Sequence, residues 1–193
     1  MLILLCGLLL FLGVHSLRAL APRLRDARIA SWGIGSWKAI YSLLSIAGFV
    51  LIVYGYGLAR SEPVLLWSPP LWLRHFAALF TLPAFVLLAA AYLPNNHFKT
   101  RLRHPMLLAV KLWALGHLLA VGWLHAVLTM AAFLAWAVIA FAAARRRDRA
   151  AGAPPATRSN VVSSAAAVII GAVAWAVFVF HLHLPLIGIA PFG

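Results

Sequence analysis

The sequence predicts an all-α, polytopic transmembrane helix bundle of about six spans, with both termini on the outer, periplasmic side. Three observations support this class. Of the 193 residues, 65% are hydrophobic and 10% are charged, and the mean hydropathy is +0.99. A soluble domain is nearer to about half apolar and about a quarter charged. The apolar residues also form long runs, and the basic residues are concentrated in every second link between them.

A helix needs about 20 apolar residues to cross the hydrocarbon core of a bilayer. The runs of suitable composition are roughly 1–20, 37–58, 72–93, 105–121, 124–144 and 161–181. Val121-Gly122-Trp123 separates the fourth run from the fifth, and a glycine beside an interfacial tryptophan predicts a tight turn there. No basic residue precedes the first run, so we expect a retained span rather than a cleaved signal peptide. The runs form one membrane-embedded domain, 1–193.

Basic residues predict the orientation of the spans. The links after the first, third and fifth runs are rich in lysine and arginine, whereas the opposite side carries Arg60 and Arg74. By the positive-inside rule these three links face the cytoplasm, which predicts a multi-pass protein of the bacterial inner membrane. The basic residues of these links are Arg18, Arg23, Arg25, Arg28 and Lys38; Lys99, Arg101 and Arg103; and Arg145, Arg146, Arg147, Arg149 and Arg158.

The formal net charge of +13 is therefore a signal for topology and for contact with anionic lipids. It does not indicate nucleic-acid binding. The segment 145–160 is rich in arginine, alanine, proline and glycine, which predicts a mobile cytoplasmic loop against the headgroups.

Acidic residues and cysteines are too few for several kinds of site. Asp26, Glu62 and Asp148 are the three acids, and all of them fall in predicted loops. Paired-carboxylate catalysis, a carboxylate-bridged metal centre and an acidic proton relay within the membrane are therefore disfavoured. Cys6 is the single cysteine, so an intramolecular disulfide is excluded. Gly33-Ile34-Gly35 lacks the strand and helix context of a phosphate-binding loop.

Histidines remain as candidates for chemistry. The topology puts two within spans, His15 and His117. An imidazole in a span must satisfy its ring nitrogens, either by a structural hydrogen bond between helices or in a ligand or catalytic role. The others lie at the interfaces: His97 and His104 on the cytoplasmic side, and His75, His125, His181 and His183 near the outer face.

Lys111 is a charged residue inside the fourth run. At about 100° per residue it lies within about 20° of His104 on the helix, whereas His117 faces another direction. A lysine at mid-bilayer costs on the order of 2.5–3.5 kcal/mol. We favour snorkelling of Lys111 to the cytoplasmic interface. The alternative is a non-protein anion, such as a cofactor propionate or a lipid phosphate.

The two intramembrane histidines suit one cofactor in particular. Neutral imidazoles on different helices, in apolar surroundings, are suitable axial ligands for the iron of haem. This hypothesis makes His15 and His117 the iron ligands. Arg18 and Lys111, the basic groups nearest to them on the cytoplasmic side, would then meet the propionates. On the predicted topology His15 lies closer to the cytoplasm than His117 does.

Several segments together carry a family resemblance. In order along the chain they are Phe11-Leu12-Gly13-Val14-His15-Ser16, Tyr41-Ser42-Leu43-Leu44-Ser45, Arg103-His104-Pro105-Met106-Leu107, the stretch from Lys111 to Leu118 (KLWALGHL), and Leu186-Ile187-Gly188-Ile189-Ala190-Pro191. Over essentially the whole chain they resemble the NnrU family of bacterial membrane proteins. One segment departs from the family, which commonly shows Asn and then Gly-Asp where this chain has Val121-Gly122-Trp123.

The NnrU family is similar to the plant and cyanobacterial 15-cis-ζ-carotene isomerase, a haem b protein whose redox state controls isomerisation of a carotenoid double bond. The resemblance implies that His15 and His117 are the axial ligands and that His104 is a further family histidine. It also implies an apolar polyene substrate and, if the chain is an enzyme, cis–trans isomerase activity. NnrU proteins are named for association with nitrite and nitric oxide reduction genes. The alternative is therefore a non-enzymatic membrane factor that supports denitrification.

Overall fold

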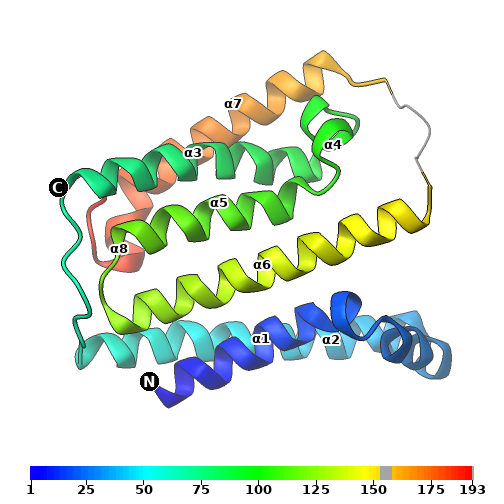
Figure 1. Ribbon diagram of the computed structural model, residues 1–193, viewed down its shortest axis with the longest axis horizontal. Coiled ribbons are helices and arrows are strands. Elements are labelled where there is room, and N and C mark those ends of the chain that lie inside the picture. The colour runs from blue at the N-terminus through cyan, green and yellow to red at the C-terminus, as the bar shows by residue number, and fades with distance from the viewer. Residues whose placement is uncertain (153–157, 193) are drawn as a thin grey trace.

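The structure, a computed structural model, describes residues 1–152 and 158–192, and the elements of this part are helices (Figure 1). Five helical segments are long and apolar enough to cross a membrane, and α5 is a shorter apolar helix. The predicted all-α polytopic class is therefore confirmed. The elements are α1 (Leu2–Leu20), α2 (Pro22–Ser61), α3 (Trp72–Tyr92), α4 (His97–Leu102), α5 (Pro105–Ala120), α6 (Leu124–Ala150), α7 (Val161–Val177), the π-helix η1 (Phe178–Leu182) and α8 (His183–Ile187).

The helices pack in a fixed order across the bundle. α1 packs along α2, and α6 contacts both of these helices. α5 then packs on α6, α3 on α5, and α7 on α3. Figure 1 shows α6 as the helix between the α1–α2 pair and the group formed by α3, α5 and α7. This position of α6 determines which side chains of α1 and α5 meet.

Three boundaries differ from the sequence prediction. The expected link between the first two runs is helical, because α2 begins at Pro22, whose fixed φ suits the first turn of a helix. α2 is interrupted at Gly33, whose φ of 78° favours glycine. α6 continues to Ala150, so the first part of the predicted 145–160 loop is helix, whereas residues 153–157 lie outside the described residues. The last apolar segment continues as far as Ile187.

Glycines allow the helix backbones to approach closely. A Cβ at Gly7 or Gly48 would lie within 3.0 Å of backbone atoms of the partner helix, and one at Gly55 would collide with the backbone of Leu4. A Cβ at Gly171 would likewise collide with the backbone of Val86, between α7 and α3. Close packing at small residues is what stabilises helix pairs in lipid, where the hydrophobic effect between helices is absent.

The turn between α5 and α6 is as tight as the sequence predicts. The Gly122 carbonyl accepts a hydrogen bond from the Leu66 N–H at 2.8 Å, and the Leu124 N–H donates to the Val64 carbonyl at 2.9 Å. A Cβ at Gly122 would collide with the carbonyl oxygen of Trp67. The turn is therefore paired with the segment that connects α2 to α3.

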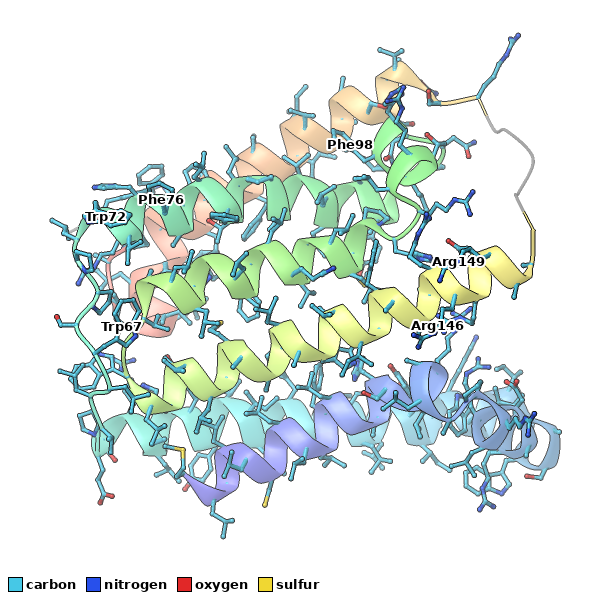
Figure 2. All side chains as sticks on the ribbon, viewed as in Figure 1. Trp67, Trp72, Phe76, Phe98, Arg146 and Arg149 are labelled. Carbon is cyan, nitrogen blue, oxygen red and sulfur yellow. The ribbon has the colours of Figure 1, made fainter. Side chains whose placement is uncertain are left out.

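Three aromatic side chains and two arginines mark opposite ends of the bundle. Figure 2 shows Trp67, Trp72 and Phe76 at one end and Arg146 and Arg149 at the other. Tryptophans at an interface and arginines on the cytoplasmic side are typical of membrane proteins. The side on which the termini lie stays a prediction.

Gly55→Ala tests the close approach of α1 and α2. Because the added Cβ meets the backbone of Leu4, we expect a loss of stability of about 1–3 kcal/mol, the range for overpacked sites. The measurement is reversible unfolding of the detergent-solubilised protein. Gly57→Ala is the matched control, since a Cβ there meets nothing within 4 Å. Equal stability of the two variants would refute this packing.

Candidate functional site

His15 lies on α1, half-buried among aromatic rings. Its Nδ1 donates a hydrogen bond to the Phe11 carbonyl at 2.7 Å. The ring centroid is 4.2 Å from that of Phe11, 5.3 Å from Tyr41 and 6.1 Å from Trp136. Since the carbonyl occupies Nδ1, Nε2 is the nitrogen left to bind a ligand.

His117 on α5 is anchored in the same way. Its Nδ1 donates to the Trp113 carbonyl at 2.9 Å, and the Trp113 ring lies 5.4 Å from the imidazole. The sequence places Trp113 one turn from His117, on the same surface, and the structure agrees. Both intramembrane histidines thus satisfy one nitrogen on the preceding turn of their own helix.

The structure separates these two histidines. Phe133 of α6 lies between their aromatic neighbours, with its ring 6.0 Å from that of Phe11 and 5.5 Å from that of Trp113. α6 itself lies between α1 and α5 (Figure 1). In the described residues, ring contacts through Phe11, Phe133 and Trp113 connect His15 to His117. Their pairing on one iron stays a prediction.

His15 instead shares a cavity with His104. A cavity of about 370 Å³ opens between α1, α5 and α6 near the arginine-rich end of the bundle. Its ionisable lining residues are His15, Arg18, His104, Arg147 and Asp148. The Arg147 guanidinium donates to the Arg18 carbonyl at 3.4 Å, which ties α6 to the end of α1. We call this space the His15 cavity.

The indole of Trp136 forms part of the wall of the His15 cavity. Its N–H is buried and has no hydrogen-bond partner among the described residues. The sequence signalled neither Trp136 nor Arg147 as a site residue. Their position becomes visible once α6 is known to pack against α1.

Asp148 orients His104 at this cavity. Its Oδ2 lies 3.1 Å from His104 Nε2, 3.6 Å from Arg103 Nη1 and 3.5 Å from Arg145 Nη1. The sequence analysis placed Asp148 in a loop, whereas it lies in the last turns of α6, beyond the predicted span. With Nε2 engaged by the carboxylate, Nδ1 of His104 is the nitrogen left free.

The charges around Asp148 also shift its titration. Desolvation raises the pKa of this carboxyl, but the hydrogen bond and charge of His104, together with the charge of Arg103, outweigh it and hold the pKa below the ordinary value. Because the pKa of Asp148 is lower in the folded state, the carboxylate stabilises the fold at pH values above its unfolded-state pKa. This stabilisation is lost as the pH falls through the folded-state pKa.

Lys111 lies away from the His15 cavity. Its Nζ is 4.4 Å from the centroid of the Phe141 ring, and the same ring contacts His104 at 6.2 Å. The ammonium therefore reaches toward the His104 end of α5, which the sequence predicts to be cytoplasmic and which snorkelling requires. Lys111 lines a second cavity, between α3, α5 and α6. Of the two basic residues predicted to meet propionates, Arg18 lines the His15 cavity and Lys111 does not.

The other histidines are scattered over the bundle. His75 stacks on Phe192 at 5.9 Å, and His97 Nδ1 lies 3.0 Å from Ser159 Oγ. His183 donates to the Ile189 carbonyl at 2.6 Å, and His181 is exposed. His125, the second residue of α6, is 3% exposed against Tyr56 and has an unpaired Nδ1, so it is buried in the protein. In the described part of the chain no three His, Cys, Asp or Glu residues gather as a metal site.

Comparison with known families agrees with this bundle. The family model described as NnrU protein matches residues 3–191. The chain belongs to the NnrU family. No curated protein and no solved structure matches it. In this NnrU protein the HS segment carries His15, the RHP segment carries His104, and both histidines line one cavity.

Asp148→Asn tests the charge cluster. We expect lower thermal stability at neutral pH, because Arg103, His104 and Arg145 lose the carboxylate between them. The wild-type protein should also lose stability as the pH falls below the ordinary aspartate range, and this loss should be smaller in the variant. Asp26→Asn, in an exposed pair with Arg25, is the control. Identical melting curves of the wild type and Asp148→Asn would show that the cluster contributes nothing.

Proposed function

We propose that this NnrU protein is a haem b-binding membrane protein with redox-gated cis–trans isomerase activity on an apolar polyene such as a carotenoid. The observation that carries the proposal is the pair of imidazoles in the His15 cavity. His15 has Nδ1 bonded to a carbonyl, and His104 has Nε2 bonded to a carboxylate. Each imidazole keeps one nitrogen free.

The residues of the His15 cavity fit a haem group chemically. Metal-binding histidines characteristically donate their second nitrogen to a backbone carbonyl or a carboxylate, which fixes the ring and its tautomer. Trp136 and Leu107 supply apolar walls, and Arg18 and Arg147 supply positive charge for the propionates. When bound, haem supplies a one-electron couple, whose potential depends on its ligands and surroundings.

Two residues are candidates to hold the haem iron together with His15. The family resemblance implies His117, whose Nε2 is free in the same manner as that of His15. His104 is supported by its place in the lining of the His15 cavity. His117 does not line this cavity, and Phe133 lies between Phe11, the neighbour of His15, and Trp113, the neighbour of His117. We therefore assign His15 and His104 to the iron in this proposal.

The polyene substrate rests on family resemblance and on location. The HS and GHL segments of the chain resemble those of the ζ-carotene isomerase. Long apolar helices with many exposed aliphatic side chains imply contact with the bilayer, where carotenoids dissolve. An apolar polyene reaches such a protein from the lipid.

The test is the absorption spectrum of the purified protein, oxidised and reduced, after expression with haem available. The wild type should show a Soret band and a low-spin spectrum. His15→Ala and His104→Ala should lose the haem or become high-spin, because each removes one axial imidazole. His117→Ala should keep the spectrum, and His181→Ala is the exposed control. The reduced wild type, supplied with a cis-carotenoid, should yield the trans isomer in a chromatographic assay.

Each contrary result has a distinct meaning. Loss of the low-spin spectrum in His117→Ala, but not in His104→Ala, would restore the pair that the family resemblance implies. A colourless protein would contradict haem binding altogether. It would favour the second candidate, a non-enzymatic membrane factor for nitrite and nitric oxide reduction. Such a factor should copurify with the enzymes that carry out these reductions.

A further inference from the structure

The side-chain ammonium of Lys111 has no carboxylate partner among the described residues. Within the described residues its Nζ makes a cation–π contact with Phe141 and no hydrogen bond or ion pair. Asp148 is shared among Arg103, His104 and Arg145, and Asp26 pairs with Arg25. A charged group within a span that lacks a protein partner is a candidate for binding an external one.

A second cavity lies beside this lysine. It is an open groove of about 440 Å³, lined by residues of α3, α5 and α6. Its walls are aliphatic apart from Lys111: Leu87 of α3, Leu108, Leu112 and Leu115 of α5, and Leu134 and Val138 of α6. This volume is in the range of small-molecule sites, about 300–1,000 Å³. We call it the Lys111 cavity.

We propose that the Lys111 cavity binds a single-chain amphiphile with a carboxylate head, such as a long-chain fatty acid. The aliphatic walls receive the hydrocarbon chain, and Lys111 pairs with the carboxylate at the edge nearest Phe141. One cation beside an otherwise aliphatic space matches a ligand with one anionic group and a long apolar tail. Because the lysine side chain is flexible, its ammonium group can contact the Phe141 ring and the carboxylate of the ligand at the same time.

The ammonium of Lys111 lies nearer to the His104 end of α5 than its Cα does, because Nζ contacts Phe141, whose ring also contacts His104. The Cα is seven residues from His104, about 10 Å along the helix axis. A single-chain carboxylic acid can enter the hydrocarbon beside these aliphatic walls in its neutral form and ionise at the lysine. One cation beside one apolar space matches such an acid better than a diacyl phospholipid.

This site is separate from the proposed haem site. Leu107 lines the His15 cavity and its neighbour Leu108 lines the Lys111 cavity, so the two spaces lie on different sides of α5. Neither the proposal nor its test requires haem or isomerase activity. The experiment below therefore remains informative if the protein is colourless.

The test is binding of cis-parinaric acid, a fluorescent polyene fatty acid, to the purified protein in nanodiscs of phosphatidylcholine at about pH 8, where a carboxyl group is ionised in water. Its methyl ester is the neutral probe of the same shape. The wild type should bind the acid about tenfold more tightly than the ester. In Lys111→Met the preference should fall to about threefold or less, while affinity for the ester should stay unchanged.

Three controls make the outcome decisive. Lys111→Arg keeps the charge and should keep the preference, and Lys38→Met removes an exposed lysine of α2 and should change nothing. Leu134→Trp, which fills the cavity, should weaken the binding of both probes. Equal binding of acid and ester to the wild type, or an undiminished preference in Lys111→Met, would overturn the proposal. Displacement of the acid by phosphatidylglycerol at equal concentration would also overturn it, in favour of a phospholipid site.

Discussion

A polar group inside a span is costly to leave without a partner, because the hydrocarbon offers none. In this chain the two intramembrane histidines meet that constraint locally. Each donates Nδ1 to the carbonyl four residues earlier, at Phe11 for His15 and at Trp113 for His117. The bond fixes the ring against its own helix and leaves the other nitrogen available. The same constraint makes Lys111 notable, since its ammonium has a ring beneath it rather than a carboxylate.

The position of α6 decides how these groups combine. Its buried residues are largely alanines, so α1 and α5 can pack closely on either side of it. Its larger side chains then separate the two sides, with Phe133 between Phe11 and Trp113. At the arginine-rich end, Ala140 and Ala144 of α6 line the His15 cavity, and Leu134 and Val138 of the same helix line the aliphatic Lys111 cavity. α6 therefore contributes to both a polar site and an apolar site.

Much of the fold is readable from the sequence, because hydropathy reports directly on what a bilayer accepts. Five helical segments are long and apolar enough to cross a membrane, and the predicted span 105–121 coincides with the shorter apolar helix α5. Gly122 forms the turn that its neighbours predict. The boundaries that failed lie in polar segments. Arginine and alanine favour helix, so α6 continues past the membrane limit that hydropathy sets, and Pro22 begins a helix where a link was expected.

The site is less predictable than the fold. Helical periodicity puts Lys111 and His117 on different faces of α5, in agreement with the contact of Lys111 with Phe141 and of His117 with Trp113. The hydropathy runs predict that His15 and His117 lie within spans. Neither pattern carries information on which helices are neighbours, so neither could place α6 between α1 and α5 or bring His15 to His104. Trp136 and Arg147 escaped notice for the same reason: their roles depend on a contact between helices that are far apart in the chain.

The arrangement of α1, α6 and α5 is tested most directly by crosslinking introduced cysteines with a short thiol-specific reagent, in a background where the exposed Cys6 is replaced by serine. The account predicts that Phe11→Cys with Phe133→Cys is crosslinked, and that Phe11→Cys with Trp113→Cys is not. The pattern should be the same in protein purified with and without added haem. Crosslinking of the second pair would place α1 against α5 and contradict the account.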